Sequence, residues 1–300
     1  MSPLFCFVWC VMTQITLFAQ TTQCINITNH DSFNNSSDFV NFTNFTNYPT
    51  VLMHGVLADK DNLDEFKTML EQHYGIKVFN LELGDGPLYS LYTPMEIQLT
   101  DLCKKIYSKD ELKNGFNFIG MSQGGLLARG YVEYCNKYPV HNLITLVAPN
   151  AGVYYKNNFF YDIYEPSNQM ELSFADYWRD PFRYELYLSN STYLADLNDE
   201  NFNYKNRLDV VDNFVMIWSA NDDVINPPQS AKFSMYFVED NNLVLYELTD
   251  TKLYQNDFLG LKTMNDENRL HFHETDCLHS EHKEPECFHQ LVHVLQKFLV

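Results

Sequence analysis

The chain has 300 residues, of which 45% are hydrophobic, so it can bury a sizeable core in one large domain or two small ones. Asp and Glu number 39 against 20 Lys and Arg, and the formal net charge is −19. This balance argues against a nucleic-acid partner, whose phosphates would be repelled, and it provides no attraction to anionic lipid surfaces.

The chain begins with an apolar run from Leu4 to Ala19. Its length is typical of the hydrophobic part of a secretory signal peptide and is too short for a full membrane span. We therefore expect residues 1–19 to be a signal peptide. Because no Lys or Arg precedes the run, an uncleaved signal anchor is the alternative. Every later apolar stretch is shorter than a membrane span, so we expect the mature chain to contain no transmembrane segment.

Residues 20–48 are dominated by Asn, Ser and Thr, a composition that cannot bury a core and predicts a disordered leader. The N-glycosylation pattern Asn-x-Ser/Thr occurs five times in this leader and once more downstream. The candidate sites are Asn26, Asn34, Asn35, Asn41, Asn44 and Asn190. Simple Asn-rich low complexity is the alternative, but the apolar run and these sites together predict entry into the secretory pathway.

Five cysteines follow the apolar run: Cys24, Cys103, Cys135, Cys277 and Cys287. In an oxidising compartment, Cys103–Cys135 and Cys277–Cys287 are candidate disulfides, although the sequence alone does not establish the pairing. Several histidines lie near Cys277, namely His271, His273, His279 and His282. Their spacings match no standard zinc motif, so we expect no metal.

From Thr50 onward, segments with strand and helix patterns alternate. Short apolar strands are predicted at 50–53, 76–81, 116–119, 142–147, 214–218 and 270–273. Helices with one apolar face are predicted at 61–74, 94–107, 123–134 and 291–300. Such alternation implies right-handed crossovers and a mostly parallel sheet that is covered on both faces. The sequence therefore predicts an α/β fold.

A long insert between Gly152 and Leu208 interrupts this alternation and is rich in Tyr, Phe and Trp. Inserts of this length are often lids or binding loops. Its rings could line an apolar groove for an acyl chain, or they could form only the core of the insert itself. We expect one domain over residues 49–300 that contains this insert at 152–208.

The segment Gly120-Met121-Ser122-Gln123-Gly124 has the pattern Gly-x-Ser-x-Gly. It follows a predicted strand and opens a predicted helix, which is the context of a nucleophile elbow rather than of an ordinary Gly-rich turn. The glycines permit the strained turn that exposes Ser122. The helix N-terminus favours negative charge that develops there.

A serine hydroxyl needs a base that takes its proton, so an acid and a histidine should follow in the order Ser, Asp, His. Asp222 lies after the strand at 214–218 in the arrangement Asp-x-Val-Ile, and it is preferred over its neighbour Asp223. The loop after the last strand carries His279 and His282. The pattern alone does not rank these two histidines and His273 as the base.

These segments resemble the palmitoyl-protein thioesterases, lysosomal enzymes that remove fatty acyl groups from cysteines. The resemblance covers nearly everything from Pro49 to the C-terminus. The motifs that carry it are His54-Gly55, Gly115-Phe116-Asn117, Gly120-Met121-Ser122-Gln123-Gly124-Gly125, Asn142-Leu143-Ile144, Tyr177-Trp178-Arg179-Asp180-Pro181, Leu194-Ala195-Asp196-Leu197-Asn198 and Leu259-Gly260-Leu261-Lys262-Thr263-Met264.

The resemblance implies an α/β-hydrolase fold with an aromatic-rich insert before the strand of the acid. Its catalytic serine, aspartate and histidine fall on Ser122, Asp222 and His279. The backbone N–H groups of Val56 and Gln123 correspond to its oxyanion hole. Its disulfide across the helix after the nucleophile corresponds to Cys103–Cys135.

The substrates that the resemblance implies are S-acylated proteins or peptides with a long-chain acyl group, and no cofactor is implied. An acyl-CoA thioesterase or lipid esterase with the same triad is an alternative. A catalytically inactive lipid-binding protein is the hypothesis from another class. The resemblance implies a lysosomal location, and secretion is the alternative.

Overall fold

The computed structural model describes residues 48–156, 163–201 and 207–300. The predicted signal peptide, the leader up to residue 47, its five glycosylation candidates and Cys24 lie outside these residues.

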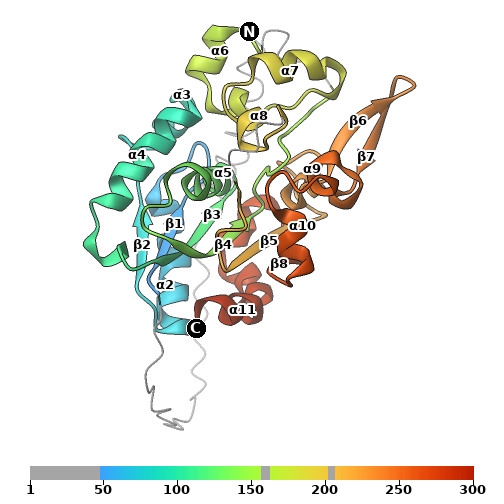
Figure 1. Ribbon diagram of the computed structural model, residues 1–300. Helices are drawn as coiled ribbons and strands as arrows, with labels where there is room; N and C mark the ends of the chain where they lie inside the picture. Colours follow the sequence, from blue (N-terminus) through green and yellow to red (C-terminus); the bar gives the residue numbers. More distant parts are fainter. Residues whose placement is uncertain (1–47, 157–162, 202–206) are drawn as a thin grey trace, which may run out of the picture. The chain divides into compact units, whose positions relative to one another are not determined.

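Six strands form the central sheet (Figure 1). They are β1 (Thr50–Met53), β2 (Val78–Leu81), β3 (Phe116–Met121), β4 (Val140–Leu146), β5 (Asn213–Ser219) and β8 (Leu270–Thr275). Their order is β2-β1-β3-β4-β5-β8, and every neighbouring pair is parallel. The inner strands β1, β3, β4 and β5 are mostly buried, which is why their sequences are largely apolar, whereas the edge strand β8 is exposed at alternate positions. The predicted parallel α/β sheet is confirmed.

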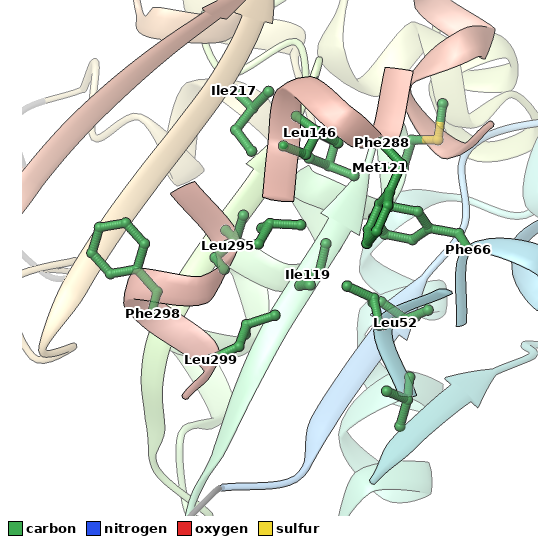
Figure 2. Close-up of a cluster of buried hydrophobic side chains, with 14 of the residues drawn as sticks. Leu52, Phe66, Ile119, Met121, Leu146, Ile217, Phe288, Leu295, Phe298 and Leu299 are labelled. Carbon is green, nitrogen blue, oxygen red and sulfur yellow. The ribbon is translucent and has the colours of Figure 1, made fainter. Parts of the chain in front are cut away.

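Helices α2 (Asp64–Tyr74) and α11 (Pro285–Leu299) pack on one face of this sheet. Their side chains form one buried cluster with strand residues such as Leu52 and Ile119 (Figure 2). The helix predicted to begin at residue 61 starts as a short 3₁₀ helix, η1 (Lys60–Leu63), which the Asp59 side chain caps. It ends at Gly75, whose φ of 65° suits a residue without a Cβ.

Helices α4 (Met95–Tyr107) and α5 (Gln123–Gly130) pack against each other, and α5 contacts β3 and β4. Beyond α5 the chain continues as a π-helical turn, Tyr131–Cys135, which the sequence pattern did not distinguish from the α-helix. The Tyr131 ring lies 5.6 Å from the Phe116 ring, so this turn covers the start of β3. A disulfide joins Cys103 of α4 to Cys135 at the end of the turn.

The insert contains three short helices, α6 (Pro166–Glu171), α7 (Tyr184–Asn190) and α8 (Leu194–Leu197). Two 3₁₀ helices, η4 (Ser173–Tyr177) and η5 (Pro181–Arg183), lie between α6 and α7. Most of its described rings are buried: Tyr154, Tyr164, Phe174, Tyr177, Trp178, Tyr187 and Tyr193. These rings therefore contribute to the core of the insert. The glycosylation candidate Asn190 is half-buried, and its Nδ2 donates to the carbonyl of Tyr164 at 3.2 Å.

The remaining elements are short. An antiparallel hairpin consists of β6 (Met235–Glu239) and β7 (Asn242–Tyr246). The others are α3 (Pro87–Tyr92), α9 (Lys252–Gln255), α10 (Leu261–Asp266) and four 3₁₀ helices, η2 (Asp110–Leu112), η6 (Pro228–Lys232), η7 (Leu248–Asp250) and η8 (His279–Lys283). Among the helices of the described residues, none combines the length and the apolar character needed to cross a bilayer.

Candidate active site

Ser122 occupies a strained turn between β3 and α5. Its φ is 54° and its ψ is −127°, a conformation that residues with a Cβ rarely adopt. The turn is held by hydrogen bonds on both sides: the Ser122 N–H donates to the Leu146 carbonyl at 2.8 Å, and the Gly125 N–H donates to the Ser122 carbonyl at 2.9 Å. This strand–turn–helix geometry is that of a nucleophile elbow, which presents the serine side chain at the end of the strand.

Two glycines let the chain approach Ser122 closely. A Cβ added at Gly55 would lie 2.9 Å from the Ser122 Cβ and 3.4 Å from its Oγ, so the loop after β1 packs directly against the serine side chain. A Cβ added at Gly124 would overlap the carbonyl oxygens of Met53 and His54. The loop after β1 and the first turn of α5 therefore meet at Ser122, and side chains at these two positions would separate them.

Asp222 and His279 are in direct contact, although 57 positions separate them in the sequence. The His279 Nδ1 lies 2.8 Å from Asp222 Oδ2. A carboxylate oxygen only accepts, so Nδ1 carries the proton and Nε2 keeps a free lone pair. The other oxygen, Asp222 Oδ1, accepts from the backbone N–H groups of Val224 at 2.9 Å and Ile225 at 2.8 Å. The acid is thus fixed by its own loop and orients the imidazole.

The other two histidines of this region have structural roles. His282 is fully buried, its Nδ1 donates to the carbonyl of Leu278 at 2.9 Å, and its Nε2 accepts from the Thr275 hydroxyl at 2.7 Å. Burial lowers the pKa of His282, which favours the neutral ring, and the two hydrogen bonds occupy both of its nitrogens. His273 donates to the Gln290 carbonyl of α11 at 3.0 Å. Of the three candidates, His279 alone contacts the acid.

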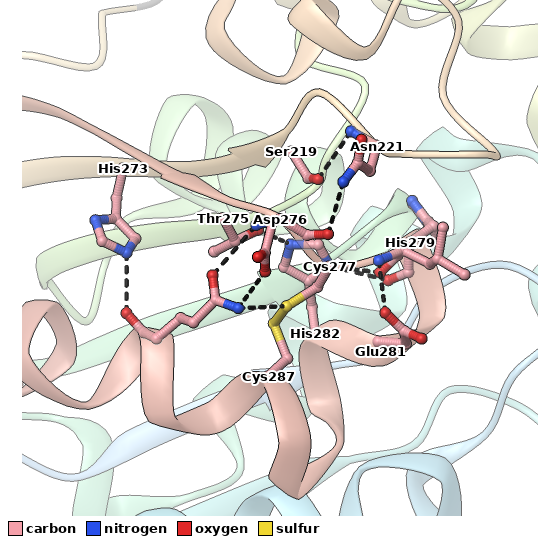
Figure 3. Close-up of a disulfide and its surroundings, with 12 residues drawn as sticks. Ser219, Asn221, His273, Thr275, Asp276, Cys277, His279, Glu281, His282 and Cys287 are labelled. Carbon is pink, nitrogen blue, oxygen red and sulfur yellow. Dashed lines mark hydrogen bonds between the residues drawn. A yellow bond between two sulfur atoms is a disulfide. The ribbon is translucent and has the colours of Figure 1, made fainter.

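A disulfide between Cys277 and Cys287 joins the loop that carries His279 to α11 (Figure 3). His279 begins the short 3₁₀ helix η8 (His279–Lys283), which leads into α11. Gln290 of α11 accepts from the backbone N–H of Asp276 at 3.2 Å. The histidine loop is therefore held against α11 by a covalent bond and by hydrogen bonds.

The three residues share one edge of the sheet. Ser122 follows β3, Asp222 follows β5, and His279 follows β8, and parallel strands end at the same edge. Among the described residues, Ser122 Oγ and His279 Nε2 are not hydrogen-bonded to each other. In enzymes without bound substrate, such bonds are often long and shorten only when substrate binds.

Val56 and Gln123, whose N–H groups are candidate oxyanion donors, lie on the two segments that meet at Ser122. Val56 follows Gly55, and Gln123 is the first residue of α5. The loop after β1 is anchored on both sides of Val56. The His54 Nε2 lies 3.1 Å from Glu82 Oε1, and the Leu57 N–H donates to Ser90 Oγ at 2.9 Å.

A metal site is not found in the part of the chain that the structure describes: no group of three or more His, Cys, Asp or Glu side chains there could hold an ion. The His271 Nε2 lies 3.1 Å from Asn213 Oδ1.

Comparison with solved structures identifies the fold. The chain is similar to a monoacylglycerol lipase from Paleococcus ferrophilus, with a TM-score of 0.53 and 15% sequence identity over 83% of this chain and 93% of the lipase. At this identity the likeness concerns the fold alone. Together with the parallel sheet and the elbow, it assigns the α/β-hydrolase fold.

Comparison with protein sequences is more specific. A family model for palmitoyl protein thioesterase matches residues 49–279. Palmitoyl-protein thioesterase 3 of Dictyostelium discoideum is 36% identical over 248 residues, which is 78% of this chain and 86% of that protein. Palmitoyl-protein thioesterase 1 of Caenorhabditis elegans is 30% identical over 253 residues, which is 76% of this chain and 85% of that protein. The chain is a hydrolase that belongs to the palmitoyl protein thioesterase family.

Proposed function

We propose that this chain removes long-chain fatty acyl groups from S-acylated cysteines of proteins or peptides, with Ser122 as nucleophile, His279 as base and Asp222 as the acid that orients the base. The observation that carries the proposal is the 2.8 Å contact between Asp222 Oδ2 and His279 Nδ1 at the sheet edge where the Ser122 elbow lies. It leaves Nε2 of the imidazole ready to accept a proton.

The reaction proceeds in two acyl-transfer steps. His279 Nε2 takes the proton of Ser122 Oγ as the oxygen attacks the thioester carbonyl, and the tetrahedral intermediate collapses with expulsion of the cysteine thiolate, which receives the proton from His279. In the second step His279 removes a proton from water, the hydroxide attacks the acyl-serine, and the fatty acid leaves as Ser122 is reprotonated. The chemistry requires no cofactor.

The oxyanion of both tetrahedral intermediates would be held by the N–H groups of Val56 and Gln123. Each such donor is worth about 3 kcal/mol in the transition state. Because the donors are backbone groups, the nature of the Val56 side chain is unimportant for this role.

Ser122→Ala tests the proposal. We expect the variant to lose at least about a thousandfold in kcat on a palmitoyl-cysteine peptide and to keep its fold by circular dichroism. Ser108→Ala, which removes the hydroxyl of an exposed serine, is the control and keeps wild-type turnover. Retained turnover in Ser122→Ala would exclude this serine as the nucleophile.

The leaving group is tested by comparing kcat/KM on three substrates with the same acyl chain: a palmitoyl-cysteine peptide, palmitoyl-CoA and a palmitoyl lipid ester. We expect the peptide thioester to be preferred. A higher value on palmitoyl-CoA or on the lipid ester would reassign the substrate but keep the triad. Failure of a fluorophosphonate to label the wild-type protein would instead indicate an inactive lipid-binding protein.

The two disulfides support passage through an oxidising compartment, since such bonds form in the secretory pathway and are rare in the cytosol. We propose that residues 1–19 direct this entry, that residues 20–48 form a glycosylated leader, and that the enzyme acts in the lysosome or outside the cell. N-terminal sequencing of the mature protein and its mobility before and after glycosidase treatment test these assignments.

A further inference from the structure

A buried polar network lies beside the candidate oxyanion hole. Its four members are Ser90 of α3, Gln98 of α4, Gln123 of α5 and Ser173 of η4. Each has at most 3% of its surface exposed. Four polar side chains so deeply buried are costly unless they are hydrogen-bonded, and here each of them is. We call this set the Ser90 network.

The main-chain carbonyl of Ser90 is the common acceptor of the network. It accepts from Gln98 Nε2 at 3.1 Å, from Gln123 Nε2 at 2.8 Å and from Ser173 Oγ at 2.7 Å. The Gln123 side chain is also fixed at its other atoms, because its Oε1 lies 2.8 Å from Ser173 Oγ and its Nε2 lies 3.3 Å from Gln98 Oε1. The residue whose backbone would donate to the oxyanion thus has its side chain immobilised at both ends.

The side chain of Ser90 contacts the loop that carries the other candidate oxyanion donor, Val56. Its Oγ donates to the Pro87 carbonyl at 2.6 Å and accepts from the Leu57 N–H at 2.9 Å. Leu57 follows Val56 directly and has a φ of 56°, an unfavourable conformation for a residue with a Cβ. The hydrogen bond to Ser90 opposes relaxation of this peptide, and relaxation would rotate or shift the neighbouring Val56 N–H.

From these contacts we infer that Ser90 is a positioning residue that sets the spacing between the two oxyanion donors, Val56 N–H and Gln123 N–H. One residue contacts both segments, through its hydroxyl on one side and its carbonyl on the other. Ser173 connects the insert to the same network, so the spacing between the two donors also depends on the position of η4. This inference rests on the proposed function, because it concerns the oxyanion hole of that reaction.

The chain offers a matched control. Ser230 is also fully buried in a short helical segment, its Oγ donates to the Gly152 carbonyl at 2.6 Å, and it accepts from the Ala151 N–H at 3.1 Å. It therefore makes the same two kinds of hydrogen bond as Ser90 but supports the loop after β4. Ser90→Ala and Ser230→Ala remove the same atom from equally buried positions.

The experiment compares kcat, KM and the affinity of two inhibitors in the full chain. A palmityl trifluoromethyl ketone forms a tetrahedral adduct with the serine and needs the oxyanion donors. A thioether analogue of the substrate binds without such an adduct.

For Ser90→Ala we expect kcat to fall about 10- to 100-fold, since misplacement of a catalytic group by about 1 Å can cost a hundredfold. The affinity for the ketone should fall by a similar factor. KM and thioether binding should stay close to wild type, and Ser230→Ala should retain wild-type kcat and ketone affinity.

Two results would overturn the inference: a kcat of Ser90→Ala equal to that of Ser230→Ala, or an equal loss of affinity for both inhibitors, which indicates a general collapse of the site. If Ser90→Ala does not fold, Gln123→Met and Ser173→Ala carry the same test, because they remove donors to the Ser90 carbonyl and leave Ser90 in place. A wild-type protein without esterase or thioesterase activity would refute the proposed function itself. An active wild type with an unaffected Ser90→Ala would refute only the role of Ser90.

Discussion

Asp223 Oδ1 accepts a hydrogen bond from the backbone N–H of His279 at 3.2 Å, while the adjacent Asp222 contacts the ring of the same histidine. The two neighbouring acids thus have separate tasks: Asp223 fixes the main chain of His279 and Asp222 fixes its imidazole. The two acids were both candidates because they are neighbours in the loop after β5, and their different contacts with His279 predict that their loss has unequal consequences.

Asp222→Asn should lower kcat about ten-thousandfold, because an amide in place of the carboxylate favours the wrong imidazole tautomer. Asp223→Asn is the control. Its amide oxygen can still accept the His279 N–H, so its loss should stay below about tenfold. Both values come from steady-state hydrolysis of a palmitoyl-cysteine peptide. A larger loss in Asp223→Asn than in Asp222→Asn would reverse the assignment.

The buried pair formed by Arg129 of α5 and Glu133 of the π-helical turn that follows is expected to be important for stability. The pair is 3.2 Å apart with both side chains fully buried, and Arg129 also donates to Asn198 Oδ1 of the insert at 2.9 Å. Burial raises the pKa of Glu133, and the charge of Arg129 opposes this rise. The pKa of Glu133 is raised to about 8, so the pair is ionised above that pH; at pH 9, Arg129→Met removes the partner of this carboxylate and should lower the free energy of unfolding by about 3–5 kcal/mol.

The double variant Arg129→Met/Glu133→Leu is the control for that loss. It removes both charges, so part of the stability should return in urea unfolding. A double variant no more stable than the single one would show that the loss comes from packing and from the bonds to the insert instead.

Asp176 of the insert should make the protein less stable as pH rises. It is buried, accepts from the Met95 N–H of α4 at 2.7 Å and from the Thr192 hydroxyl at 2.7 Å, and burial raises its pKa from 3.8 to about 7. Between pH 3.8 and about 7, the Asp176 carboxyl is ionised in the unfolded chain but remains protonated in the folded chain. The contribution of Asp176 is thus fully present below pH 3.8 and is lost as pH rises to about 7.

The measurement is the free energy of unfolding against pH for the wild type and for Asp176→Asn. The new amide does not titrate, so the wild type should lose stability relative to it over this interval. Asp196→Asn removes an exposed aspartate of the same insert and should follow the wild-type curve. A constant difference between the wild type and Asp176→Asn would contradict the expected titration.

Loss of the two disulfides should have different effects on activity: only loss of Cys277–Cys287 should lower kcat. The Cys277→Ala/Cys287→Ala variant opens a short loop and should lower the free energy of unfolding by about 2–3 kcal/mol. It should also lower kcat, because Cys277 is two positions from His279. Removal of Cys103–Cys135 should cost about 3–4 kcal/mol, since that loop is longer, but should leave kcat nearly unchanged at temperatures where the variant is folded. An unchanged kcat in the Cys277→Ala/Cys287→Ala variant would show that the histidine loop does not need its bridge.

The main sheet could be predicted from the sequence because its inner strands are mostly buried and read as short apolar runs. All six strands of this sheet begin and end within two residues of the predicted limits. The β6–β7 hairpin was missed, since its strands are half-exposed without clear alternation. A signal was present in its turn: Asp240 and Asn241 have φ values of 48° and 63°, and Asp and Asn are favoured where two consecutive residues need positive φ.

The candidate site was only partly predictable. The elbow of Ser122 is local, so the pattern around it sufficed. The choice of His279 among three histidines depended on the resemblance, because its partner lies far away in the sequence. The Ser90 network could not be found from the sequence, since Ser173 reaches Ser90 across 83 positions and buried Ser and Gln side chains have no periodic signature.

The bridge from the histidine loop to α11 also bears on when the enzyme first becomes active. During translation, the nucleophile emerges from the ribosome well before the base, and the base is secured only once Cys287 and the helix around it have followed. A nascent chain held on the ribosome with α11 still in the exit tunnel should therefore be inert toward a fluorophosphonate, and reactivity should begin only once α11 has left the tunnel.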